Sequence, residues 1–156
     1  MDVGFLFLRG RPCRFAAALL AGCALHVAAA AADVKVFTAG AFAPVLQRMV
    51  PAFEKRTGHK VTVVDDTSPS IEARIRRGED FDLAVLEPAK LEALAKLGAV
   101  SDGSITLLAK TVQNPTVYAG AVSTAAVDDN AALSLLILLA SEDTQAVLKE
   151  KGMAAP

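Results

Sequence analysis

The segment between Val34 and Val100 alternates short apolar strands with helical patterns, and this alternation constrains the fold more than any other feature. Runs rich in β-branched residues predict strands at residues 34–38, 61–64 and 81–85. Each run is followed by apolar residues at three- and four-residue spacing, which is typical of a helix. Alternating strands and helices predict an α/β fold, a three-layer sandwich around a mostly parallel sheet.

The junctions between these strands and helices are where a binding site is expected. In parallel sheets, ligands bind at the carboxyl ends of the strands, where the helices begin. Ser68 is predicted to cap the second helix, because Pro69 then occupies its first position. The junctions read Ala-Gly-Ala at residues 39–41, Thr-Ser-Pro-Ser at residues 67–70 and Glu-Pro at residues 87–88.

The C-terminal part has weaker strand patterns and one strongly apolar helix. Strands are predicted at residues 104–109 and 116–122. The apolar helix begins after Asp128 or Asp129 and includes residues 133–139, and a short helix follows at residues 142–151. A helix that is apolar nearly all round needs a covering surface, so we expect it to pack across the sheet or to mediate self-association.

The first 32 residues have the layout of a secretory signal peptide. Arginines at positions 9, 11 and 14 precede an uncharged stretch at residues 15–32 that is mostly Ala and Leu. Cleavage near Ala31 or Ala32 would leave residues 33–156 as a single exported α/β lobe, in the periplasm or another extracytoplasmic compartment. Two alternatives remain: a lipid anchor at Cys23, which ends the lipobox-like sequence Leu-Ala-Gly-Cys, and an uncleaved membrane anchor.

Charge and cysteine content exclude several classes of function for the exported part. The leader holds three Arg and one Asp, so the remaining residues carry a net charge of −3, against −1 for the whole chain. No basic patch stands out, which argues against nucleic acid as a partner. Both cysteines lie in the leader, so the exported chain has no disulfide, thiol nucleophile or thiolate metal site.

Several short motifs follow one another within residues 34–100 in a characteristic order and spacing: residues 36–41 (Val-Phe-Thr-Ala-Gly-Ala), 52–61, 67–70, 75–78, 82–85 and 94–98. A further set follows at the C-terminal end, from Thr116 through residues 140–142 to residues 152–153. In this order and spacing, the chain resembles the periplasmic molybdate-binding proteins of ABC importers, within the type 2 solute-binding superfamily.

The resemblance implies two α/β lobes with a ligand cleft between them. Family members carry a second lobe where this chain has only residues 98–104. The chain would therefore consist of lobe one with the C-terminal helices, and its cleft would have one wall. The resemblance further implies a small anion such as molybdate or tungstate as ligand, and an ABC transporter permease as partner.

The chemistry of the first two junctions fits a small oxyanion. Such an anion needs hydrogen-bond donors, which helix N-termini supply as free backbone N–H groups with a partial positive charge. Molybdate binders usually carry Ser where this chain has Ala41, so one side-chain donor is missing. The predicted ligand-binding residues are Thr38, Gly40 and Ala41 at the first junction and Thr67, Ser68 and Ser70 at the second.

Ordinary helix capping is the alternative role of the hydroxyl residues at the second junction. For the whole protein, the alternative is an exported interaction domain that no longer binds ligand, because a site with one wall leaves its ligand in water. Neither a nucleophile–base pair nor metal-ligand spacing is visible, so no enzyme, cofactor or metal site is predicted. The remaining charged residues considered, predicted to be solvated or, for Asp82, hydrogen-bonded, are Asp65, Asp66, Arg74, Glu79 and Asp82.

Overall fold

The computed structural model describes residues 31–156. The predicted leader, with its possible lipobox at Cys23, falls almost entirely on residues 1–30 and so lies outside the described residues. The described elements, in chain order, are β1 (Asp33–Ala39), η1 (Gly40–Phe42), α1 (Ala43–Thr57), β2 (Lys60–Asp66), α2 (Ser68–Arg76), β3 (Leu83–Leu86), α3 (Pro88–Lys96), η2 (Asp102–Ser104), β4 (Thr106–Thr111), β5 (Val117–Val122), α4 (Asp129–Leu139), α5 (Glu142–Glu150) and β6 (Met153–Ala154).

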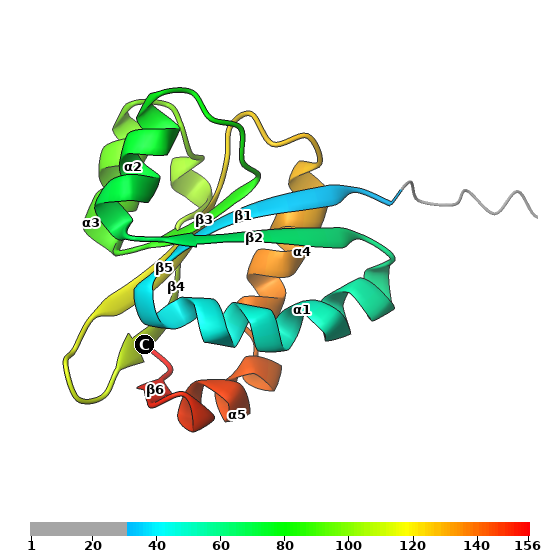
Figure 1. Cartoon of the computed structure of the whole chain (residues 1–156), viewed down its shortest axis with the longest axis vertical. Coiled ribbons are helices and arrows are strands. Elements are labelled where there is room, and N and C mark those ends of the chain that lie inside the picture. The colour runs from blue at the N-terminus through cyan, green and yellow to red at the C-terminus, as the bar shows by residue number, and fades with distance from the viewer. Residues whose placement is uncertain (1–30) are drawn as a thin grey trace, which may run out of the picture.

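The six strands form one sheet in the order β2-β1-β3-β5-β4-β6 (Figure 1). Strand β1 pairs in parallel with β2 and β3, whereas β5 pairs antiparallel with β3 and β4, and β6 antiparallel with β4. The expectation of a mostly parallel sheet therefore holds only for β1–β3. Residues 112–116 join β4 directly to β5, and so short a connection can link only antiparallel strands.

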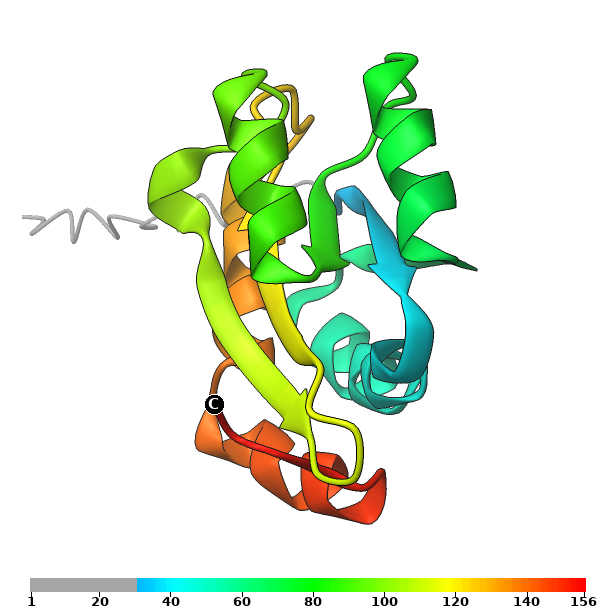
Figure 2. The same ribbon diagram turned by 90° about the vertical axis from the view of Figure 1, so that its left-hand side faces the viewer.

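The three-layer arrangement is confirmed, with a separate apolar core on each face of the sheet (Figure 2). Helices α1, α4 and α5 cover one face, and α2 and α3 cover the other. Successive strand residues point to opposite faces, so Val36 joins the first core while Phe37 joins the second. All four residues of β3 are buried, as befits a strand covered on both sides.

Helix α2 begins one residue earlier than its predicted cap implied. Thr67, with extended backbone, is the N-cap, and its Oγ1 accepts from the backbone N–H of Ser70 at 3.3 Å. Ser68 is therefore the first helical residue, and the prediction that it caps the helix is wrong. Two consequences follow: Pro69 occupies the second helical position, and the Ser68 side chain is available for another partner.

The apolar helix α4 packs across the sheet, which is one of the two arrangements expected for it; the other was self-association. Leu135, Leu136 and Leu139 are fully or almost fully buried. Gly120 on β5 permits this close packing, because a Cβ there would lie 2.5 Å from Leu136 Cδ1. Ile137 remains 62% exposed on the outer side of the helix.

Asp82 makes the structural hydrogen bonds predicted for it. Its carboxylate accepts from the backbone N–H groups of Lys35 and Val127, each at 2.8 Å, and the residue is 5% exposed. These bonds link β1 to the segment that precedes α4.

Within residues 31–156, no single helix is long and apolar enough to cross a membrane. Only α4 and α5 taken together have the length and composition of a membrane span, and they are bent by 61° relative to each other.

A candidate ligand site at the carboxyl ends of the parallel strands

The three strand-to-helix junctions meet at one edge of the sheet (Figure 1). Parallel pairing places Ala39 opposite Asp66 at the end of β2, and Thr38 opposite Val85 near the end of β3. Because β1 lies between β2 and β3, the turn at Gly40 is flanked by the starts of α2 and α3. The structure therefore brings the residues of the first two predicted junctions to a common edge.

A hydrogen bond ties the starts of α2 and α3 together. Ser68 Oγ donates to Glu87 Oε2 at 2.7 Å, and Glu87 is the N-cap residue of α3. The bond holds the second and third junctions at a fixed separation. It also engages a hydroxyl that was predicted to contact the ligand.

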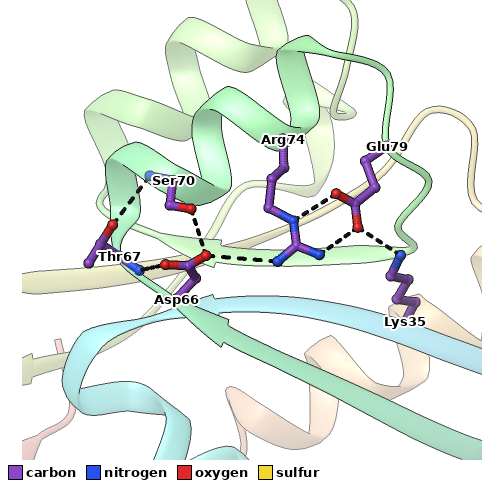
Figure 3. A network of polar contacts seen from close by, with 6 residues as sticks. All are labelled: Lys35, Asp66, Thr67, Ser70, Arg74 and Glu79. Atoms are coloured by element: carbon purple, nitrogen blue, oxygen red, sulfur yellow. Dashed lines mark hydrogen bonds and ion pairs between the residues drawn. The ribbon is translucent and has the colours of Figure 1, made fainter.

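The carboxylate of Asp66 occupies the N-terminus of α2 (Figure 3). Its Oδ1 accepts from the Thr67 backbone N–H at 2.7 Å, and its Oδ2 accepts from Ser70 Oγ at 2.6 Å. These two hydrogen bonds, the Ser70 hydroxyl first, lower the pKa of Asp66 below its ordinary value. An internal anion thus already takes two of the donors at this helix start, the Thr67 N–H and the Ser70 hydroxyl.

Asp66 was predicted to be solvated surface; its side chain is 36% exposed, but it also makes hydrogen bonds at the start of α2 that were not predicted. Its local signal was present in the sequence, since an Asp directly before a Thr-Ser-Pro-Ser helix start is well placed to accept from the first turn. The residue also lies 3.9 Å from Arg74 Nη1. It is therefore part of a larger polar network.

Arg74 and Glu79 form the centre of this network (Figure 3). Two guanidinium nitrogens of Arg74 donate to Glu79 at 2.7 and 2.6 Å, and Lys35 Nζ donates to Glu79 at 3.1 Å. These bonds, that from Arg74 foremost, lower the pKa of Glu79 to about 2, while Glu79 raises the pKa of Arg74. Arg74 also lies over the ring of Phe37, 4.9 Å from its centroid, so neither ion is a freely solvated surface group as predicted.

The first junction depends on a close approach between Gly40 and Tyr118. Gly40 has φ +62°, and a Cβ there would lie 2.9 Å from Tyr118 Oη. The Ala41 backbone N–H donates to the same oxygen at 3.4 Å. Tyr118 was not predicted as a site residue, because it is 77 residues from Ala41 and no local pattern links the two.

Thr38 is the most deeply placed of the predicted site residues. It is fully buried on β1, and its Oγ1 has no hydrogen-bond partner among the described residues. A buried hydroxyl without a partner is costly and uncommon. It marks the first junction as a place where the described chain leaves a polar group unsatisfied.

The arrangement is suited to non-covalent binding. It combines helix starts, hydroxyl groups and backbone N–H groups at one edge of the sheet, which are donors for a polar solute. Within residues 31–156, no group of three or more His, Cys, Asp or Glu side chains is placed to hold a metal ion.

Three solved structures share this fold. The substrate-binding domain assigned to a molybdenum ABC transporter of Clostridium difficile aligns with a TM-score of 0.69 at 12% identity, covering 81% of this chain and 100% of that chain. The periplasmic molybdate-binding protein of Azotobacter vinelandii gives 0.68 at 13% identity, covering 79% and 99%. Iron-bound HitA of Pseudomonas aeruginosa gives 0.62 at 11% identity, covering 80% and 89%.

These similarities establish the fold and leave the ligand open. The three structures carry different ligand descriptions, molybdenum or molybdate in two and iron in the third. No protein of curated function matches the sequence significantly. The family model of the bacterial extracellular solute-binding proteins matches residues 34–112, just over half of the chain. This chain therefore belongs to the bacterial extracellular solute-binding proteins.

Proposed function

We propose that this solute-binding protein is the exported binding component of an ABC importer and takes a small oxyanion, such as molybdate or tungstate, at the carboxyl edge of β1–β3. One observation carries the proposal: the three strand-to-helix junctions of a solute-binding fold converge at one edge. The leader predicted at residues 1–32 directs export to the periplasm or another extracytoplasmic space. A transporter permease is the partner to which the protein would deliver its ligand.

The predicted contacts fall into two groups. Gly40 and Ala41, next to the buried Thr38, offer backbone N–H groups, of which that of Ala41 also donates to Tyr118 Oη at 3.4 Å. Thr67, Ser68 and Ser70 offer the first turn of α2. For the second group to bind an anion, the Ser70 hydroxyl must leave Asp66, and the Ser68 hydroxyl must leave Glu87.

An exported interaction domain without ligand affinity is the competing function. The same two hydrogen bonds favour it, since Ser68 and Ser70 already have carboxylate partners. The described residues also form one sheet with its helices and contain no second lobe to close over a ligand. A ligand held on one wall keeps most of its hydration and binds weakly.

Calorimetric titration of the exported protein with molybdate, tungstate, sulfate and phosphate separates the two functions. The solute-binding proposal expects heat and a rise in the unfolding temperature with at least one oxyanion. Ser68→Ala and Ser70→Ala should weaken that binding, and Ser134→Ala, at an exposed serine of α4, is the matched control. Absence of any response in the unchanged protein would support the interaction domain.

The state of the leader has its own measurement. The intact mass of the exported protein distinguishes cleavage near Ala31 or Ala32 from a lipid adduct on Cys23. A diacylglyceryl adduct would show that the leader is processed at Cys23 and not near Ala31 or Ala32. The lipid would then hold the protein on a membrane surface.

A further inference from the structure

We propose that the anionic group of the ligand is held in a pocket beside the first junction, where Lys151 supplies the positive charge and Tyr118 a hydrogen bond. The inference rests on the proposed function, because it concerns where the same solute is bound. It extends the ligand class to small organic anions that carry a carboxylate or oxyanion group. It moves the charge-recognising centre away from the start of α2.

The pocket has a volume of about 640 Å³ and lies between the first junction, the β4–β5 hairpin and the C-terminal end of α5. Its lining includes Ala41 of the first junction, Asn114 and Tyr118 of the hairpin, and Lys151 and Gly152 after α5. Small-molecule sites commonly measure about 300–1,000 Å³. The pocket is therefore large enough for an organic acid as well as for a tetrahedral oxyanion.

The charge of the lining selects an anion. Lys151 is the one charged residue among those that line the pocket, and no carboxylate lines it. The start of α2 is the opposite case, since two carboxylates, Asp66 and Glu87, hold its serine hydroxyls. An anion that uses the serine hydroxyls of α2 must displace these carboxylates, whereas in the pocket it meets a cation whose ion pair, among the described residues, is with the exposed Glu150.

Several residues that line the pocket carry hydrogen-bond donors. The Tyr118 hydroxyl accepts from Ala41 N–H, and within the described residues it donates no hydrogen bond of its own. Gln113 and Asn114 of the hairpin, whose amides carry both donors and an acceptor, also line the pocket. An ammonium, a phenol and amide N–H groups are a donor set suited to carboxylate or oxyanion oxygens.

The walls of the pocket are held by backbone hydrogen bonds. Val112 N–H donates to the Gly152 carbonyl at 3.1 Å, and Thr111 of β4 pairs with Met153 of β6. Figure 2 shows the hairpin beside the C-terminal segment. The Lys151 backbone N–H is bonded to the last turn of α5, which fixes the position of this residue relative to the hairpin.

Glu150 is the one nearby competitor for the ammonium among the described residues. Its Oε1 lies 3.3 Å from Lys151 Nζ, and its side chain is 60% exposed. Exposed pairs of neighbouring residues are weak and easily exchanged. A ligand anion in the pocket can therefore take over Lys151, and removal of the Glu150 charge should favour this.

Titration of the exported protein with molybdate, tungstate, phosphate, succinate and citrate tests the inference. Lys151→Gln should weaken binding of the preferred anion by about tenfold or more, because it removes a charge-assisted hydrogen bond. Tyr118→Phe should weaken it less, and Glu150→Gln should strengthen it. Lys149→Gln makes the same charge change on α5 outside the pocket and should leave affinity nearly unchanged.

Each outcome has a distinct meaning. If the unchanged protein binds an anion, and Lys151→Gln behaves like Lys149→Gln while Ser70→Ala weakens binding, the pocket assignment fails and the proposed function stands. If the unchanged protein binds none of the five anions, both fail. Far-ultraviolet circular dichroism and unfolding temperatures of the variants distinguish lost binding from lost folding, and Glu150→Gln remains informative because an affinity gain cannot arise from misfolding.

Discussion

The start of α2 and the pocket beside Lys151 lie close to the same edge of the sheet but differ in the charged groups that border them. At α2, the Asp66 carboxylate already accepts from Thr67 N–H and Ser70 Oγ. In the pocket, the single charged lining residue is the cation Lys151. The comparison teaches that a helix start rich in donors becomes an anion site only when no internal carboxylate has taken those donors.

The largest expected effect is a loss of folding stability on substitution of Gly40, which lies at the first junction beside the pocket. Gly40→Ala should destabilise the protein by about 1–2 kcal/mol from its left-handed backbone alone. The contact of the new Cβ with Tyr118 Oη, at 2.9 Å, adds to this cost and displaces a pocket wall. Denaturant unfolding measures the change, while the hydrogen-bonded start of α2 should be unaffected.

Gly58→Ala is the matched control for this substitution. Gly58 also has positive φ, +79°, but a Cβ at this position would meet nothing within 4 Å among the described residues. The difference between the two variants therefore reports the Tyr118 contact. Equal destabilisation would show that Tyr118 moves aside easily and that the first junction is less tightly built than the distances indicate.

The next largest expected effect is on ligand affinity, when the Asp66 carboxylate is removed from the start of α2. Asp66→Asn removes the internal anion from the start of α2 while keeping the shape of the side chain. If ligand binds at α2, affinity should rise severalfold, because Ser70 Oγ and Thr67 N–H no longer face a charged competitor. If ligand binds beside Lys151, affinity should change little; calorimetry with the preferred anion decides between the two regions.

The smallest effect is the pH dependence that Glu79 confers on the network behind α2. Because the pKa of Glu79 is lowered from 4.5 to about 2, its ion pairs stabilise the folded state fully above about pH 4.5. That contribution is lost as the pH falls from there towards 2. The unfolding temperature of the unchanged protein should therefore approach that of Glu79→Gln over this window.

Glu142→Gln, at an exposed residue on α5, is the control for this titration. Its unfolding temperature should run parallel to that of the unchanged protein through the same range. A constant offset between Glu79→Gln and the unchanged protein from pH 6 to 2 would contradict the assigned network.

The N-terminal half of the fold was predictable because its signals are local. Apolar spacing within β1–α1 and β2–α2 indicates each element, and the order of elements requires parallel pairing. Strands β4 and β5 were predicted near their observed positions, but their antiparallel direction was not, although Asn-Pro at residues 114–115 is a turn signal within the connection between them. Strand direction there depends on which strands pair, and pairing is a property of the whole sheet.

The candidate site divides in the same way. The polar junction at residues 67–70 and the glycine at position 40 were visible in the sequence, and their meeting at one edge follows from parallel pairing. The partners of these residues were not visible. Tyr118 contacts the first junction, and Lys151 lines the pocket beside it, from distant parts of the chain, so no spacing rule indicates them.

The sequence by itself determined the α/β class, the positions of the first three strands along the chain, their parallel direction and the residue types at their carboxyl ends. Periodicity and turn chemistry act over a few residues, and they suffice for these features. Only the tertiary structure decided which donors are free. Hydrogen bonding is a competition among all groups that the fold brings together. Here Asp66 and Glu87 accept from the serine hydroxyls, while Lys151 lines a pocket and pairs only with the exposed Glu150 among the described residues.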